Sequence, residues 1–299
     1  MEIKELLLLC IEKGASDLHV TDNEPPILRV DGKLLRTEFS TLSKQDLKRI
    51  IYSVLTDPQK ETFERELELD FSLALPAIDR FRVNIHQQRG SVEAAFRRVP
   101  LEIPGIDSLG LPSIVTDLAR KSNGLVLVTG PTGMGKTTTL AAMINLINNE
   151  RECMVVSIED PIEFIFSNKK SIIKQREIYA DTLSFSEALR HALRQDSNVI
   201  VVGEMRDLET ISTALTAAET GHLVLATLHT PDAPQTVERI IDVFPPHQQQ
   251  QVKLQLADCL QGVVSQLLLP HSSGKGRVLA TEIMIGTAGV RNLIREQEI

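Results

Sequence analysis

The sequence predicts two domains, a small α+β module followed by an α/β domain with a parallel sheet. Three observations support this prediction. The 299-residue chain is longer than one usual domain, and its 42% hydrophobic and 24% charged residues are ordinary for a globular protein. Before about residue 100 the pattern indicates hairpins, whereas from about Ile114 apolar strands alternate with helices. Residues 130–137 match the phosphate-binding loop that joins a strand to a helix in such domains.

The first module, residues 1–100, begins with a hairpin and a helix. The runs Ile27–Val30 and Lys33–Arg36 flank Asp31–Gly32, which is a strong signal for a two-residue hairpin. A helix is predicted to follow a Ser43 cap, because apolar residues recur at helical spacing over Leu47–Leu55.

A second hairpin is predicted over residues 81–98, with paired residue numbers that sum to 179. This register places most apolar residues on one face and sets Arg82 opposite Arg97 on the other. Like charges opposed in this way are destabilising unless an anion lies between them. The anion could be a neighbouring subunit's triphosphate, with both residues as arginine fingers supplied in trans. It could equally be one of the domain's own acids, such as Glu93.

Prolines and glycines punctuate residues 101–113, which are predicted to form the interdomain linker. Residues 114–299 then form the α/β domain. Its strands are predicted over Leu125–Thr129, Met154–Ile158, Val199–Gly203 and Leu223–Leu228.

End signals predict the helices between these strands. Ser184 and Glu187 form a capping box for one helix. The helix that starts after Asp207 closes at Gly221, and Pro234 suits the first turn of another.

The phosphate-binding loop, Gly130-Pro-Thr-Gly-Met-Gly-Lys136-Thr137, fits G-x-x-x-x-G-K-[ST] and precedes a helical pattern over Thr138–Asn148. Glycines let the backbone N–H groups approach phosphate oxygens, and the helix adds its positive end. Lys136 is predicted to reach the β- and γ-phosphates and Thr137 to hold Mg²⁺. The predicted nucleotide-binding residues are Gly130, Pro131, Thr132, Gly133, Met134, Gly135, Lys136, Thr137 and Thr138.

Acidic residues follow the second strand at the edge where open α/β sheets bind ligands. Glu159, Asp160 and Glu163 lie there. A carboxylate at this edge can orient a water for attack on the γ-phosphate or hold Mg²⁺ through water. The structural alternative is an acidic turn followed by a proline stop.

The next two strands end in further candidates. Glu204 follows Val199–Gly203 as in a Walker B segment, and is predicted to face the metal and the attacking water; surface pairing with Arg206 is the alternative. His222 and His229 bracket the fourth strand. Structural and catalytic interpretations of the pair are evenly balanced, and His229 at the carboxyl end is the better candidate for sensing the γ-phosphate.

Charge and cysteine content exclude several classes of protein. The net charge is −8, the pI is near 5.5 and no long Lys/Arg block occurs, which argues against nucleic acid as the primary partner. Cys10, Cys153 and Cys259 are too far apart for a disulfide framework or a C-x-x-C metal site, so a reducing, cytosolic compartment fits. The apolar run Leu6–Ile11 is too short for a signal peptide or a membrane span.

Together these segments resemble the secretion ATPase superfamily that drives type II secretion, type IV secretion and type IV pili. The resemblance rests on the order of four motifs: the Walker A loop, an acidic box over Glu159–Glu163, a Walker B with Gly203–Asp207, and a His box over Thr220–Thr230.

Further segments resemble the pilus retraction ATPases, the PilT type. They are Ala15–His19, Leu140–Ile144, Arg239–Phe244 and Val290–Glu296. Pilus assembly and type II secretion ATPases usually carry a tetracysteine zinc element, which this sequence lacks, so retraction is favoured over extension and no zinc is expected. Met134 occupies a loop position often held by serine, where we expect little effect because that position contributes mainly backbone.

The resemblance implies a PAS-like N-terminal domain, a RecA-like P-loop NTPase domain, and a homohexameric ring with ATP and Mg²⁺ between domains and subunits. It implies a cytoplasmic location at the inner membrane, reached through a pilus platform protein. The function implied is a motor for pilus retraction. The alternatives are an extension, secretion or DNA-translocating ATPase of the same superfamily, or a nucleotide-dependent regulatory protein that hydrolyses little.

The resemblance also implies roles for the candidate residues. Glu163 and Glu204 become the catalytic carboxylates, and His222 and His229 belong to the His box. Arg82 and Arg97 become the arginine fingers.

Overall fold

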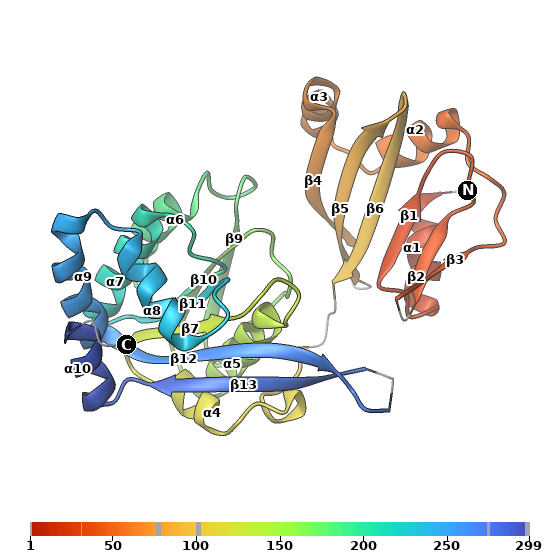
Figure 1. Cartoon of the computed structure of the whole chain (residues 1–299). Helices are drawn as coiled ribbons and strands as arrows, with labels where there is room; N and C mark the ends of the chain where they lie inside the picture. The colour runs from red at the N-terminus through yellow and green to blue at the C-terminus, as the bar shows by residue number, and fades with distance from the viewer. Residues whose placement is uncertain (1, 31, 76–78, 100–102, 274–275, 297–299) are drawn as a thin grey trace. The chain divides into compact units, whose positions relative to one another are not determined.

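The computed structural model describes residues 2–30, 32–75, 79–99, 103–273 and 276–296. The chain divides into two compact units, Met1–Leu101 and Glu102–Ile299 (Figure 1). Each unit has its own sheet and its own buried apolar cluster. Among the described residues there is no helix with both the length and the apolar character needed to span a bilayer.

The N-terminal unit is built on an antiparallel sheet. Its described elements are α1 (Ile3–Glu12), β1 (Asp17–Val20), β2 (Ile27–Val30), β3 (Lys33–Arg36), α2 (Lys44–Tyr52), α3 (Asp57–Glu66), β4 (Glu68–Leu75), β5 (Asp79–Gln88) and β6 (Ser91–Val99). In these residues the strand order is β3-β2-β1-β6-β5-β4. Apolar residues of α1 and α2 pack on the sheet residues Phe81 and Phe96, which are fully buried.

The described residues confirm the hairpins and the helix predicted for this unit. β2 pairs with β3 from Ile27 opposite Arg36 to Val30 opposite Lys33; Asp31 lies outside the described residues. Ser43 caps α2 by accepting a hydrogen bond from the backbone N–H of Asp46 at 3.2 Å. β5 and β6 pair in the predicted register, so Arg82 lies opposite Arg97. Alternation of apolar and polar residues was therefore sufficient to fix this register.

The C-terminal unit is an α/β domain. Its described elements are η1 (Asp107–Leu109), α4 (Ile114–Ala119), β7 (Gly124–Thr129), α5 (Lys136–Glu150), β8 (Met154–Glu159), β9 (Ile172–Glu177), α6 (Phe185–Ala192), β10 (Val199–Val202), α7 (Leu208–Glu219), β11 (Leu223–Leu228), α8 (Ala233–Asp242), α9 (Pro246–Cys259), β12 (Leu260–Pro270), β13 (Arg277–Ile285) and α10 (Ala288–Glu296).

The sheet of this unit has the order β13-β12-β7-β11-β10-β8-β9 in the described residues. All neighbouring strands are parallel except β13, which pairs antiparallel with β12 (Figure 1). The helices divide between the two faces. Buried residues of α4 and α5 cluster on one face, and those of α6, α7, α8 and α9 on the other. Because both faces are covered, β7 and β11 are buried along their whole length.

The four strands predicted for this domain are β7, β8, β10 and β11, each ending within one residue of its predicted bounds. β9, β12 and β13 were not predicted. Of the predicted linker, residues 103–113 pack on this unit, where Ile106 and Leu111 join the cluster of α4 and α5. Residues 100–102 lie outside the described residues.

The predicted helix ends are confirmed with one correction. Asp207 caps α7 by accepting from the N–H of Thr210 at 2.8 Å, and Gly221 follows the helix with φ +103°. Pro234 lies in the first turn of α8. The capping box predicted for α6 is only half formed, because Ser184 accepts from the N–H of Glu187 but the Glu187 carboxylate turns to Arg190.

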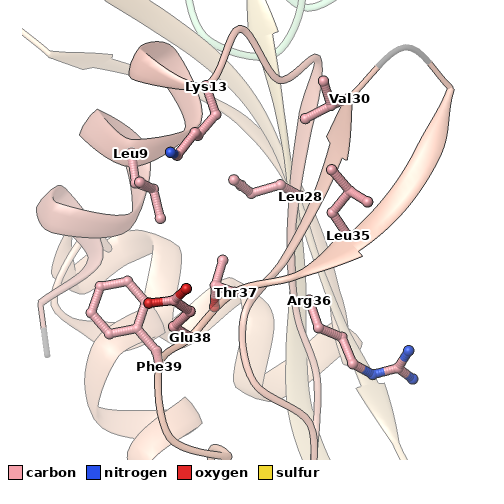
Figure 2. A pocket seen from close by; sticks show the side chains of 9 residues that line it. All are labelled: Leu9, Lys13, Leu28, Val30, Leu35, Arg36, Thr37, Glu38 and Phe39. Carbon is pink, nitrogen blue, oxygen red and sulfur yellow. The ribbon is translucent and has the colours of Figure 1, made fainter.

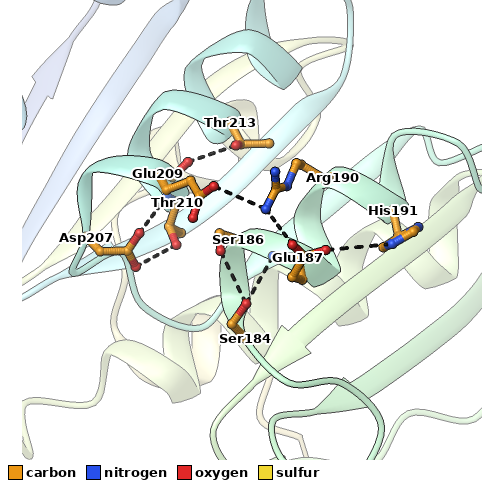
Figure 3. A network of polar contacts seen from close by, with 9 residues as sticks. All are labelled: Ser184, Ser186, Glu187, Arg190, His191, Asp207, Glu209, Thr210 and Thr213. Carbon is orange, nitrogen blue, oxygen red and sulfur yellow. Dashed lines mark hydrogen bonds and ion pairs between the residues drawn. The ribbon is translucent and has the colours of Figure 1, made fainter.

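Arg190 joins two helices through a polar network (Figure 3). Its guanidinium lies 2.6 Å from a Glu187 carboxylate oxygen on α6 and 3.1 Å from one of Glu209 on α7. A charged donor binds a carboxylate more strongly than a backbone N–H does, which explains the half-formed capping box. Both ion pairs are about half exposed, so we expect them to orient α7 rather than to add much stability.

Candidate nucleotide site

The phosphate-binding loop connects the carboxyl end of β7 to the first turn of α5. Gly130, Gly133 and Gly135 have φ values of +137°, +79° and +82°, the region that L-residues rarely adopt. At Gly130 the space is also closed, because an added Cβ would collide with the carbonyl oxygen of Gln266 on β12. The glycines of the motif are therefore required by backbone geometry, as the sequence predicted.

Lys136 folds back over the loop. Its Nζ donates to the carbonyl oxygens of Gly130 at 2.8 Å and Pro131 at 3.0 Å, and the residue is 7% exposed. Burial lowers the pKa of Lys136, while the charges of Glu204 and Glu163 act in the opposite direction. The loop thus holds a buried ammonium group on which the charges of Glu204 and Glu163 act.

His229 connects the loop to the acid after β10. Its Nε2 lies 3.1 Å from a Glu204 carboxylate oxygen, and its Nδ1 lies 3.4 Å from Lys136 Nζ and 3.4 Å from the hydroxyl of Thr132. An ammonium can only donate, so Nδ1 accepts and Nε2 carries the proton that Glu204 accepts. The loop, the acid and the histidine come from the ends of β7, β10 and β11, and β11 is paired with each of the other two.

Glu204 is mostly buried, with 14% of its side chain accessible. It also forms an ion pair with Arg206, Nε to carboxylate oxygen at 2.8 Å. The pairing with Arg206 that we considered as an alternative therefore exists, and it coexists with the contact to His229.

The acidic box divides into a structural and a site-facing residue. Glu159 is buried and accepts hydrogen bonds from the Ser157 hydroxyl at 2.6 Å, Gln175 at 3.1 Å and the backbone N–H of Glu163. Burial raises the pKa of Glu159, against the effect of these hydrogen bonds. Glu163 is half-buried, and its charge acts on Lys136. Glu159 therefore organises the turn that carries Glu163, because it accepts from the Glu163 backbone.

The residues around the loop fit Mg²⁺. Thr137 and Thr138 are half-buried in the first turn of α5, and neither hydroxyl bonds to another described residue. No cluster of three or more His, Cys, Asp or Glu side chains able to hold a metal occurs in the described ranges. A hydroxyl together with a nearby carboxylate such as Glu204 suits Mg²⁺, which takes its other ligands from phosphates and water.

His222 lies at the other end of β11. Its Nδ1 is 3.1 Å from the carbonyl oxygen of Ala217, whereas the phosphate loop lies at the carboxyl end of the sheet. The two histidines are seven residue steps apart along β11, which separates them by about 23 Å at roughly 3.3 Å per residue. Within one chain, the structure brings His229 to the loop and leaves His222 away from it.

The two candidate arginine fingers belong to the N-terminal unit. Arg97 Nε lies 2.9 Å from a carboxylate oxygen of the buried Asp17. Arg82 is exposed and forms no hydrogen bond or ion pair within the described part of the chain. Glu93, the acid considered for this pairing, instead accepts from the N–H of Asp22 at 3.2 Å. The domain's own partner for Arg97 is thus Asp17 on β1, which offsets the charge of Arg97 from the side of β6 opposite to Arg82.

Replacing Asp17 by asparagine is expected to destabilise the protein in a pH-dependent way. Burial alone raises the pKa of Asp17, but hydrogen bonds from Ser16 and Arg97 and the charge of Arg97 outweigh it, so the pKa lies below its ordinary value. A carboxylate with a lowered pKa contributes its full stability when the pH is above its pKa in the unfolded chain, about 3.9 for aspartate. This contribution is lost as the pH falls through the pKa in the folded protein. Thermal unfolding at pH 3 to 7 should show a difference between wild type and D17N that shrinks below about pH 4. A constant difference would contradict this account.

β12 and β13 make contacts with the phosphate loop that were not predicted from the sequence. Gln266 Nε2 donates to the carbonyl oxygen of Met134 at 2.6 Å, and Arg277 donates to that of Gly133 at 3.2 Å. The N–H of Leu268 lies 3.3 Å from the Met134 sulfur, so this side chain also has a contact. Without a prediction of β12 and β13, nothing in the sequence linked these residues to the loop.

The described residues include a hollow in each of the two units. One of about 490 Å³ adjoins the loop and is lined by Thr132, Arg206, His229 and Arg239, among others. The other, of about 640 Å³, lies in the N-terminal unit between α1 and the β2–β3 hairpin. Figure 2 shows its mainly apolar lining, with the charged groups of Lys13, Arg36 and Glu38 around it.

Comparison with known proteins places this geometry in context. Residues 2–289 match the model of the family described as type II/IV secretion system protein. The chain is 49% identical over 299 residues to the type IV pilus retractation ATPase PilT of Pseudomonas aeruginosa, covering 100% of this chain and 87% of that one. It is 49% identical over 274 residues to a twitching motility protein of Neisseria gonorrhoeae, covering 92% and 73%.

A solved structure has the same fold. The crystal structure of the pilus retraction motor PilT with bound ADP superposes with a TM-score of 0.96 at 50% identity, covering 100% of this chain and 87% of that one. The match confirms the predicted fold class, a RecA-like ATPase domain preceded by a smaller α+β domain.

Proposed function

The chain belongs to the type II/IV secretion system protein family, and on this premise we propose that it is an ATP-hydrolysing motor that powers the retraction of type IV pili. The observation that carries the proposal is the bridge from Lys136 through His229 to Glu204, in a chain 49% identical to a pilus retraction ATPase. This bridge links the phosphate-binding group to the carboxylate that acts on the attacking water.

Each residue of the site has a distinct task in this proposal. Backbone N–H groups of the loop and Lys136 bind the phosphates, and Thr137 and Glu204 would hold Mg²⁺. When bound there, Mg²⁺ would supply positive charge that offsets the charge of the phosphates. Glu204 orients and deprotonates the attacking water, with Glu163 as the second carboxylate. His229 lies where it can sense the γ-phosphate, because it contacts both Lys136 and Glu204.

A ring completes the site. We propose a homohexamer in which Arg82 and Arg97 of one chain reach the nucleotide bound by its neighbour, as arginine fingers do. The exposed, like-charged pair in the N-terminal unit supports this role, since it lies on the face opposite the buried apolar residues. Loss of γ-phosphate contacts on both sides of an interface would then change the angle between domains and act on a pilus platform protein at the cytoplasmic face of the inner membrane.

Glu204→Gln is expected to lower the steady-state rate of ATP hydrolysis by about 10² to 10⁴, because the amide cannot take a proton from water. Affinity for ADP should remain close to that of the wild type. Glu209→Gln makes the same exchange on an exposed acid of α7 and serves as the control. Phosphate release by the purified proteins measures the effect. Tight ATP binding with almost no turnover by the wild type would indicate a regulatory protein instead.

Cells that lack this chain test the direction of the motor. Loss of retraction should leave surplus surface pili without twitching, and the wild-type and E209Q chains should restore twitching while E204Q should not. Cells without pili would indicate an extension motor. Hydrolysis that rises on addition of DNA would indicate a translocase.

A further inference from the structure

Gln266 is a buried amide, 2% exposed, at the point where β12 passes the phosphate loop. Its Oε1 accepts from the Thr139 hydroxyl on α5 at 2.9 Å, and its Nε2 donates to the carbonyl oxygen of Met134 in the loop at 2.6 Å. A carbonyl can only accept, so the NH₂ group must face Met134 and the orientation of the amide is fixed. One side chain thus connects the strand, the loop and the helix of the nucleotide site.

The hydrogen bond from Gln266 to the Met134 carbonyl also orients the N–H of Gly135, because both groups belong to one peptide plane. In a trans peptide the carbonyl oxygen and the following N–H point in opposite directions. A donor that holds the Met134 oxygen against β12 therefore turns the N–H of Gly135 away from β12. Arg277 holds the carbonyl oxygen of Gly133 in the same way, which turns the N–H of Met134. These N–H groups belong to the loop that cradles phosphates.

The packing around Gln266 leaves the loop little freedom. A Cβ added at Gly130 would collide with the Gln266 carbonyl oxygen, and one added at Gly135 would lie 3.3 Å from Gln266 Nε2. The loop is therefore seated on Gln266 at its first and last glycines.

We propose that Gln266 is a positioning residue of the nucleotide site, which sets the direction of the Gly135 N–H by donating to the Met134 carbonyl. It acts through the loop and has no part in the bond-breaking step. The inference rests on the proposed function, since it assumes that this loop binds the phosphates of ATP.

Gln266→Glu tests the inference. The carboxylate keeps the acceptor for Thr139 but removes the donor to Met134, so the carbonyl loses its partner and the loop can rotate. We expect the Kd of a fluorescent ATP analogue and of ADP to rise about tenfold, with kcat at saturating ATP changed less than about threefold. Gln261→Glu is the matched control, because it makes the same exchange on the same strand at the end near Gly124.

Gln266→Met and Thr139→Val separate positioning from folding. Q266M removes the donor without adding charge, so it should show the same rise in Kd. T139V leaves the donor in place and should raise Kd less. The number of nucleotide sites per chain should stay at the wild-type value, and the unfolding temperature without nucleotide should fall by no more than several degrees.

Two results would overturn the inference. One is an unchanged Kd in both Gln266 variants. The other is a lower unfolding temperature with fewer binding sites of normal Kd, or failure of both variants to fold, since either would make Gln266 a core residue only. If the wild-type protein itself binds no ATP, the proposed function fails instead, so the two failures are distinguishable.

Discussion

Lys136→Ala is expected to abolish measurable hydrolysis, lowering kcat/KM by about 10³ or more, and to weaken ATP binding. Its ammonium is buried, and it is the donor to the carbonyl oxygens of Gly130 and Pro131. Alanine leaves both oxygens without this donor. It also removes a cation that offsets the charges of Glu204 and Glu163, so that Arg206 remains the cation paired with Glu204. The less compensated carboxylates would repel the γ-phosphate.

Phosphate release and binding of a fluorescent ATP analogue measure the effect of K136A. Lys121→Ala, at an exposed lysine beyond α4, is the control and should retain both activities. Size-exclusion chromatography should give the same assembly for both variants, because Lys136 lies under the loop and not on the surface. Wild-type turnover by K136A would remove the proposed mechanism.

Local signals in the sequence were sufficient to predict the strands and the loop that carry the motifs. The run Leu223–Leu228 is apolar except for Thr227 and is bounded by polar residues, so β11 has its predicted bounds. The β5–β6 register followed from alternation, because a shift by one residue would expose Phe81 and Phe96. The phosphate loop followed from its glycines, each of which adopts the positive φ that the motif requires.

β9 and β12 were missed for different physical reasons. β9 is an edge strand whose sequence, Ile172–Glu177, is mostly polar and shows no apolar alternation. β12 begins at the residue that follows α9, without a turn signal between them. The contacts of Gln266 with Met134 and Thr139 span 132 and 127 residues of sequence, so only the assembled sheet brings these groups together.

The pair of histidines shows where motif and geometry differ. Both belong to the His box of the resembling family, yet within one chain only His229 contacts the loop, because a strand separates it from His222. The position of His229 at the carboxyl end of a parallel strand places it beside the loop, and its role as a γ-phosphate sensor stays a prediction. Membership in the His box did not by itself predict which histidine lies beside the phosphate loop.

The like-charged pair of the N-terminal unit leads to the second large effect. Arg82→Ala and Arg97→Ala are each expected to lower hydrolysis by about 10³ to 10⁵ if the residue acts as an arginine finger. Binding of ATP to the phosphate loop should change much less. Arg89→Ala, at the turn of the same hairpin, is the control. Arg97 also pairs with Asp17, so D17N shows how much of the R97A effect comes from the lost ion pair.

Mixed assemblies decide whether the finger comes from another chain. An R82A chain retains the phosphate loop, and a K136A chain retains Arg82, so each assembly is expected to be inactive alone. If the arginine acts in trans, a mixed ring contains interfaces where an intact loop meets an intact Arg82. Turnover should therefore reappear on mixing, which no ring of independent subunits could produce. Co-purification shows whether the chains have mixed. If they have mixed and hydrolysis does not return, Arg82 of a neighbouring subunit does not complete the nucleotide site.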